Sequence, residues 1–203
     1  MNTKVISISR TIGSGAEEIG RLVATGLKFR YVDSEIIDWA AQKAGVSREV
    51  IERVERTPPL IERILQHLGN APVEPGAYLP AFEASSAIYE GLIERVIRET
   101  ATAGNVVIVA HGASIPLAGM PSALRVLVSA SPEVRAQRIA DEADIGIRRA
   151  QKAVRDSDQE RASFLSRIYN VRHEEPTHYD LVVNTDHFTA SAAAALILKA
   201  AKG

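Results

Sequence analysis

The amino-acid sequence predicts an α/β protein with a doubly wound parallel sheet. Short apolar runs without polar alternation are typical of strands buried on both faces, and here they alternate with amphipathic helical patterns. The predicted strands are Val5–Ser9, Phe29–Asp33, Val106–Ala110, Leu124–Ser129 and Leu181–Asn184.

Helices between these strands are indicated by apolar spacing and by start signals. Ile19, Leu22, Val23 and Leu27 form one apolar stripe, and a longer one runs from residue 88 to residue 97. Ser131-Pro132-Glu133 combines a cap residue, a first-turn proline and an early acid, so it predicts a helix start. Thr189 opens an alanine-rich final helix.

Composition narrows the class of protein. The chain has 203 residues, 46% of them hydrophobic, which suffices for one sizeable core. A net charge of -1 gives no general field for nucleic acids or anionic membranes, so we expect neither as a partner. The absence of cysteine excludes disulfides and thiol catalysis. With no signal-peptide pattern and no apolar run of membrane length, we expect a soluble cytoplasmic protein.

The predicted strands are unevenly spaced. Roughly 70 residues of helical pattern separate Asp33 from Val106, far more than an ordinary crossover. A second stretch without strands, Ser131–Tyr179, is densely charged. We therefore predict one core that carries two helical excursions.

Gly13-Ser14-Gly15 lies between the first strand and the first helix, where backbone N–H groups and the helix dipole favour an anion. A dinucleotide fold is one interpretation, because Asp33 follows at the expected distance of about 20 residues. However, Glu18 stands where the dinucleotide fingerprint has its third glycine, and the predicted third strand follows too far along the sequence for that fold. A capping box between Ser14 and Glu17 is the simplest alternative.

The loop also departs from the phosphate-binding pattern G-x-x-x-x-G-K-[ST]. Arg10 stands at the first glycine, Ala16 at the lysine and Glu17 at the Ser/Thr position. The loop alone is therefore weak support for a nucleotide site.

The order of several motifs along nearly the whole chain resembles the cytidylate-kinase-like family, a branch of the P-loop nucleoside monophosphate kinases. The similar stretches are "ISISRTIGSGAEEIGRLVA", "FRYVDSEIIDWAAQKAG", "NVVIVAHGAS", "SDQERASFLSRIYN" and "YDLVVNT". The resemblance implies a P-loop NTPase-type, five-stranded parallel sheet with helices on both faces. It also implies a single domain, 1–203, with a helical monophosphate-binding insertion at 34–103 and a lid at 131–172.

The resemblance further implies an activity. ATP would phosphorylate CMP or dCMP, with Mg²⁺ as the second cofactor and small-molecule nucleotides as the partners of a monomer or homodimer. Phosphoryl transfer needs mainly positioning and charge neutralisation, so cations and backbone donors matter most.

The family's site residues carry over by position. An ATP-phosphate role is implied for Gly13, Ser14, Gly15, Ala16, Glu17 and Glu18, and a monophosphate role for Asp33, His111 and Asp158. Asp158 and Arg161 match the lid motif D-x-x-R, although an ordinary intrahelical pair is the alternative. For Asp33 the alternative is a helix cap.

Departures from the family pattern all remove positive charge. Ala16 replaces the usual lysine, Ala110-His111 replaces a G-R pair, and Val154 stands where a basic residue is expected. Losing one oriented donor typically costs about 10²–10³ in rate. We expect Arg10, Arg155 and Arg161 to compensate as catalytic cations, although Arg10 has the alternative of pointing to solvent.

No metal-binding residue is assigned. Glu18 suits Mg²⁺, but helix capping is the preferred role, and "HEEPTH" (173–178) is interpreted as an exposed loop. The second hypothesis for function is a non-catalytic nucleotide-binding or regulatory protein with the same fold.

Overall fold

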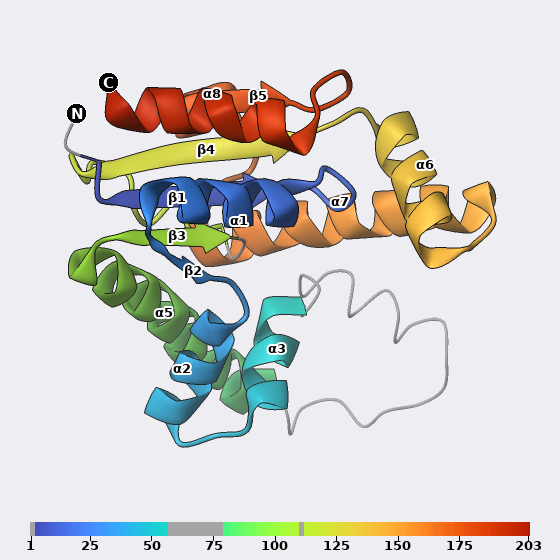
Figure 1. Ribbon diagram of the computed structural model, residues 1–203. Helices are drawn as coiled ribbons and strands as arrows, with labels where there is room; N and C mark the ends of the chain where they lie inside the picture. The colour runs from blue at the N-terminus through green and yellow to red at the C-terminus, as the bar shows by residue number, and fades with distance from the viewer. Residues whose placement is uncertain (1–2, 57–78, 110–111) are drawn as a thin grey trace.

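The computed structural model describes residues 3–56, 79–109 and 112–203, and within them it contains a five-stranded parallel sheet (Figure 1). The sheet has the order β2-β3-β1-β4-β5. The strands are β1 (Val5–Arg10), β2 (Arg30–Val32), β3 (Val106–Val109), β4 (Ala123–Ser129) and β5 (Leu181–Asn184). Every predicted strand is thus confirmed.

Strand order decides between the two nucleotide-binding interpretations. β1 pairs with β3 and β4, with Val5 opposite both Val106 and Ala123. In a dinucleotide fold β2 would lie next to β1, whereas here β3 separates them. The described residues of 34–56 and 79–98 also form helices and turns without a strand. The dinucleotide interpretation is therefore wrong.

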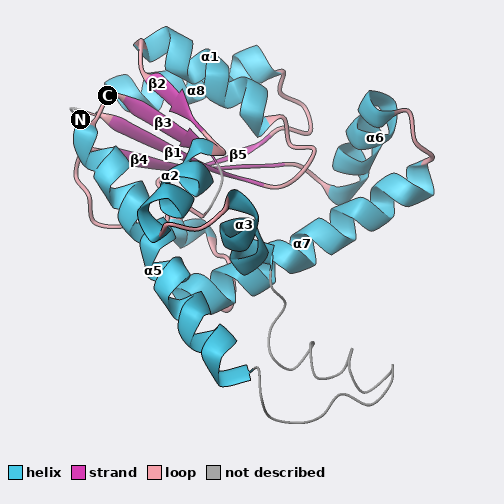
Figure 2. Ribbon diagram, turned by 90° about the horizontal axis from the view of Figure 1, so that it is seen from below, coloured by secondary structure: helices cyan, strands magenta, loops and turns pink. Residues whose placement is uncertain are grey.

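Helices cover both faces of the sheet (Figure 2). On one face lie α1 (Ala16–Leu27) and α8 (Ala190–Lys202). Their buried Ile19, Val23 and Ile197 pack against Ile6 and Ile8 of β1. Of the apolar stripe expected in the first helix, Ile19 and Val23 face the core and Leu27 packs at its edge, whereas Leu22 is 37% exposed.

The opposite face is covered by α2 (Glu35–Ala44), α3 (Arg48–Arg56) and α5 (Leu79–Ala103), all between β2 and β3 in sequence. Ile37, Ile93 and Ile97 pack there against Val5 and Ile108. β3 and the Val5–Ser9 part of β1 are buried from both sides. The expected absence of polar alternation holds for β3 but not for β1, whose buried Ser7 and Ser9 alternate with isoleucines and bond the Ser114 hydroxyl.

A helical hairpin, α6 (Pro132–Ala143) and α7 (Ile147–Tyr169), stands at the carboxyl ends of the strands (Figure 1). As predicted, Ser131 caps α6, with its hydroxyl accepting from the Val134 N–H at 3.5 Å. The hairpin has its own small core, into which Ile12 of the glycine loop packs. Val154 belongs to this core, which explains an apolar residue where a basic one was expected.

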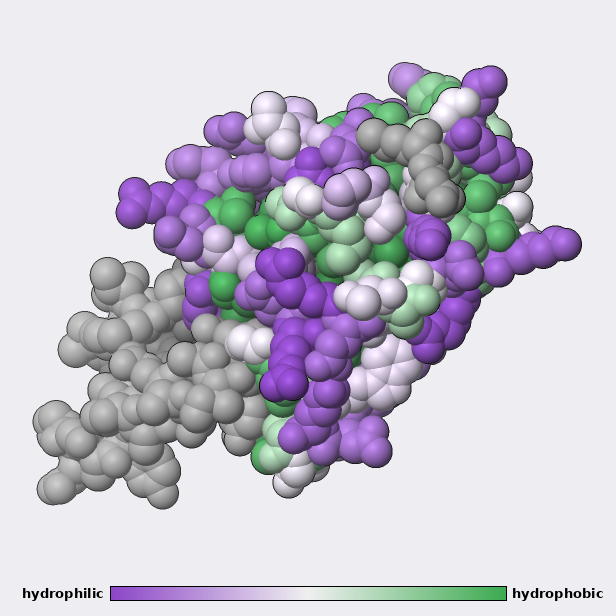
Figure 3. Space-filling model, turned by 90° about the vertical axis from the view of Figure 1, so that its left-hand side faces the viewer, coloured by the Kyte–Doolittle hydropathy of each residue, from purple (hydrophilic) through white to green (hydrophobic). Residues whose placement is uncertain are grey.

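The short 3₁₀ segment η1 (Pro176–His178) leads from this hairpin into β5. At the amino ends of the strands the surface is largely hydrophilic, with hydrophobic residues showing between the polar ones (Figure 3). Within the described residues, no helix combines the length and the apolar character that crossing a bilayer requires.

Candidate functional site

The glycine loop, residues 11–15, joins the carboxyl end of β1 to the start of α1. Ligands of open α/β sheets bind at this end of the strands. The loop turns through a hydrogen bond from the Ser14 N–H to the Thr11 carbonyl (3.1 Å), and Gly15 has a φ of 79°. Only glycine adopts this left-handed conformation at little cost, so the sequence requirement at this position is met.

The predicted capping box is wrong. The cap position of α1 is taken by Gly15, and among the described residues no side chain accepts a hydrogen bond from the first turn. Ser14 lies one residue too early; 1% of its surface is exposed, and its Oγ has no partner within the described part of the chain. The backbone donors of the helix start are therefore left for an anion.

Arg10 reaches across the loop to Glu17. Arg10 ends β1, Glu17 is the second residue of α1, and Nη1 lies 3.0 Å from Oε1. The side chains are 29% and 37% exposed, and the Arg10 Nε is buried with no partner among the residues that the structure describes. Arg10 thus stays at the loop, which excludes the alternative that it simply points to solvent. Glu18 is exposed.

Two arginines of α6, which the sequence interpretation did not single out, hold this loop in place. Arg135 is 3% exposed and donates from Nε to the Ala130 carbonyl at 3.0 Å. Its Nη1 and Nη2 bind both carboxylate oxygens of Asp158 on α7, at 2.8 and 2.6 Å. Arg135 therefore fixes Asp158 in place beside the glycine loop.

The second arginine is Arg138. It donates to the Gly13 carbonyl at 3.3 Å and to the Thr185 carbonyl at 2.7 Å. The Thr185 hydroxyl in turn donates to the Ser14 carbonyl at 2.9 Å. With its carbonyls engaged from outside, the loop keeps a fixed shape. The only sequence signal for both arginines is their spacing on the helix that Ser131 opens.

The two residues of the lid motif are paired with different partners. Arg161 binds Glu174 through Nε at 2.9 Å and Nη2 at 2.5 Å, and Glu174 also accepts from the Tyr179 hydroxyl. Asp158 binds Arg135 instead. The intrahelical alternative is therefore wrong, because tertiary contacts take both side chains.

The other predicted residues lie apart from the loop or outside the described region. Arg155 is on the exposed side of α7. Asp33 accepts from the Tyr31 hydroxyl at 3.3 Å, while the cap position of α2 is Ser34. Burial, with the charge of Asp33 second, raises the pKa of Tyr31 to about 12. His111 lies outside the described residues.

A cavity of about 170 Å³ separates the glycine loop from α7. Thr11, Asp158, Arg161, Leu165 and Glu174 line it, among others. Small-molecule sites usually measure about 300–1,000 Å³, so this space suits a phosphate group better than a whole nucleotide.

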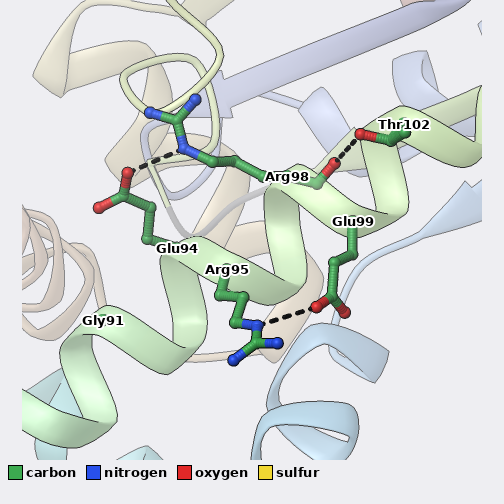
Figure 4. Close-up of a pocket in the computed structure, with 6 residues that line it drawn as sticks. All are labelled: Gly91, Glu94, Arg95, Arg98, Glu99 and Thr102. Atoms are coloured by element: carbon green, nitrogen blue, oxygen red, sulfur yellow. Dashed lines mark hydrogen bonds and ion pairs between the residues drawn. The ribbon is translucent and has the colours of Figure 1, made fainter.

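A larger hollow of about 520 Å³ lies along α5 (Figure 4). Its charges neutralise one another along the helix, with Arg98 bound to Glu94 at 2.9 Å and Arg95 to Glu99 at 3.0 Å. Arg95 is 72% exposed. Such pairs are typical of a solvated helix surface, so we assign no site there.

The strand order and the glycine loop before α1 define a fold of the P-loop kinase type. The sequence pattern of the Cytidylate kinase-like family matches residues 5–187, and the chain belongs to this family. A cytidylate kinase from Archaeoglobus fulgidus is 23% identical over 198 residues, which cover 96% of this chain and 93% of that protein.

Solved structures agree on the fold. An uncharacterized protein from Eubacterium ventriosum superposes with a TM-score of 0.70 at 14% identity, covering 99% of both chains. Shikimate kinase from Bacteroides thetaiotaomicron has a TM-score of 0.54 at 13% identity, covering 98% of this chain and 99% of that one. The protein is thus kinase-like in family and in fold.

Proposed function

We propose that the chain is an ATP-dependent nucleoside monophosphate kinase that converts CMP or dCMP to the diphosphate. The observation that carries this proposal is the start of α1. Its backbone donors are capped by no side chain of the described residues, and they face a rigid glycine loop that has Arg10 at its edge. That combination supports a phosphate site, because free backbone donors and the helix dipole favour an anion.

In this reaction an oxygen of the CMP phosphate attacks the γ-phosphorus of ATP. The new P–O bond forms as the bond from the γ-phosphorus to the β,γ-bridging oxygen breaks, leaving CDP and ADP. The transition state spreads negative charge over the transferred group, and positioned cations stabilise it. Arg10 at the loop and Arg161 on α7 are the proposed cations, with Arg155 as a third if α7 moves.

Mg²⁺ fits the residues present. It is usually held by one or two carboxylates together with substrate phosphates, and Glu17 and Glu18 supply carboxylates in the first turn of α1. When bound, the ion supplies charge neutralisation of the phosphates. The chain's own residues position the nucleotide.

The acceptor site is proposed on the other side of the glycine loop. Helices within 34–103 would cover the monophosphate, and the hairpin within 131–172 would form the lid. Asp33, His111 and Asp158 are its proposed contacts. A whole nucleotide needs more room than about 170 Å³, so we expect α7 to move away as substrates enter. The choice of CMP rests on the family and on the archaeal relative.

The pairing of charges in the site favours a second function. Arg10 is bound by Glu17 and Arg161 by Glu174. If these pairs persist with nucleotide present, transition-state charge stays unneutralised and the chain is a non-catalytic nucleotide-binding protein.

Phosphate transfer from Mg-ATP to CMP, dCMP, UMP, AMP and GMP at high enzyme concentration tests the proposal. We expect transfer to CMP or dCMP above the others. Arg10→Ala should lower the rate by about 10²–10³, while Lys199→Ala on α8 serves as the control for lost charge at a distance. If folded protein transfers phosphate to none of these acceptors, the kinase proposal is refuted and the non-catalytic nucleotide-binding function is favoured instead.

A further inference from the structure

Glu17 occupies the position at which a P-loop carries its metal-binding hydroxyl. In the pattern G-K-[ST] the Ser or Thr binds Mg²⁺ through its side chain, and the corresponding residues here are Gly15-Ala16-Glu17. α1 begins at Ala16, so Glu17 lies in the first helical turn. Ala16 therefore replaces the lysine, and the carboxylate of Glu17 replaces the hydroxyl.

The carboxylate of Glu17 is engaged with Arg10, the cation that directly precedes the glycine loop. Arg10 ends β1 and Glu17 begins α1, so their 3.0 Å ion pair connects the two ends of the glycine loop. A phosphate entering the loop has to compete with Glu17 for Arg10. With no cation on the phosphates, the negative charges of the phosphates and of Glu17 also repel each other.

The ion pair is built to be exchanged. Both side chains are partly exposed, 29% and 37%, and such pairs contribute little net stability. Two buried polar atoms of this segment, the Arg10 Nε and the Ser14 Oγ, have no hydrogen-bond partner among the described residues. The site thus has hydrogen-bond donors that the carboxylate of Glu17 does not satisfy and that can bind a further acceptor.

We propose that Glu17 makes this site selective for nucleotides complexed with a divalent cation. Without the cation, the carboxylate holds Arg10 and repels bare polyphosphate. When a cation accompanies the phosphates, the carboxylate turns to it as an oxygen ligand, and Arg10 is released to a phosphate oxygen. This inference rests on the proposed function and adds a specificity-determining residue to it.

Glu133 provides a matched control. It lies in the first turn of another helix, α6, carries the same charge and is exposed, but it is not part of the ion pair with Arg10. Glu133→Gln therefore removes one charge from a helix start and leaves the exchange between Glu17 and Arg10 intact.

The test is calorimetric titration of the full chain with ATP in excess Mg²⁺ and with ATP in EDTA, at matched ionic strength. We expect the wild type to bind the magnesium complex at least roughly tenfold tighter than free ATP, the effect of one charge-assisted contact. Glu17→Gln should bind free ATP more tightly and the complex more weakly, which brings the ratio close to one. Glu133→Gln should keep most of the wild-type ratio.

The outcomes separate the two proposals. If the wild type binds ATP but Glu17→Gln keeps the wild-type ratio, the inference about Glu17 is overturned and the proposed function stands. An equal loss of selectivity in Glu133→Gln would overturn it as well, because the effect would then be general charge. Failure of all three folded proteins to bind either form of ATP would overturn both proposals.

Discussion

The ion pair between Arg135 and Asp158 yields a prediction about stability. The two side chains differ in exposure, 4% for the guanidinium and 40% for the carboxylate. Removing one partner of a buried pair costs about 3–5 kcal/mol, because the other charge is left uncompensated. Since solvent already reaches Asp158, we expect Asp158→Ala to lower the free energy of unfolding by about 3 kcal/mol, the bottom of that range.

Removing the arginine instead of the aspartate destabilises the protein for a different reason. Arg135→Met fills most of the space and leaves a carboxylate that water can hydrate, but it gives up the bond to the Ala130 carbonyl. We expect a loss of about 2 kcal/mol. In the double variant no buried charge remains. Its free energy of unfolding should therefore fall by about 2–3 kcal/mol, rather than by about 5 kcal/mol, the sum of the two single losses.

Urea denaturation followed by circular dichroism measures all three values. A loss of about 3 kcal/mol corresponds to a melting temperature lower by about 6–12 °C for a chain of this size. Additive losses, within about 0.5 kcal/mol, would refute the reasoning. A loss below about 1 kcal/mol in Asp158→Ala would mean that the pair is weak and that Asp158 is available to a nucleotide.

Three further predictions concern a backbone position and two pKa values. Gly13→Ala should destabilise the protein more than Gly15→Ala in the same denaturation assay. A Cβ at position 13 would lie 2.8 Å from a carbonyl oxygen of α6, whereas the space at position 15 is open. The left-handed backbone conformation alone costs about 1–2 kcal/mol for alanine at either position. Asp33→Asn should lower the pKa of Tyr31 from about 12, which phenolate absorbance measures. In the wild type, Tyr31 contributes to folding stability below its unfolded pKa near 10, and this contribution is lost as pH rises towards 12. Hydrogen bonds from its arginine partner on β4 lower the pKa of Asp180, so it stabilises above its unfolded pKa and that gain is lost on acidification; Asp180→Asn should flatten the acid side of the stability profile.

The sequence predicted those parts of the fold that depend on local pattern. β3 is buried on both faces and apolar throughout, so it was recognisable from composition alone. β1 was recognisable by its β-branched residues, although the buried Ser7 and Ser9 alternate with them. Ser131 was also predictable as a cap, because its proline and acid stand beside it in sequence. The resemblance to the kinase family supplied the rest of the architecture.

Contacts between distant segments were not predictable. Ser14 and Glu17 match a capping box, yet Gly15 takes the cap and Glu17 turns to Arg10. Arg135 touches the carbonyl of Ile12, 123 residues away, and no local signal announces such a contact. Spacing alone suggested the wrong partners for the two lid-motif residues for the same reason. Local pattern thus located the loop, but the contacts that shape it come from α6.

Strand order also affects how the chain folds during synthesis. β1 is made first, yet both of its neighbours, β3 and β4, lie about 100 residues further along the chain. At about 5–20 residues per second, the ribosome needs several seconds or more to deliver them. During that time Val5–Arg10 has no partner strand, and non-local parallel pairing is intrinsically slow. A nascent chain halted before residue 106 therefore carries an apolar strand that chaperones can bind, and one halted after residue 129 can have its central strands paired.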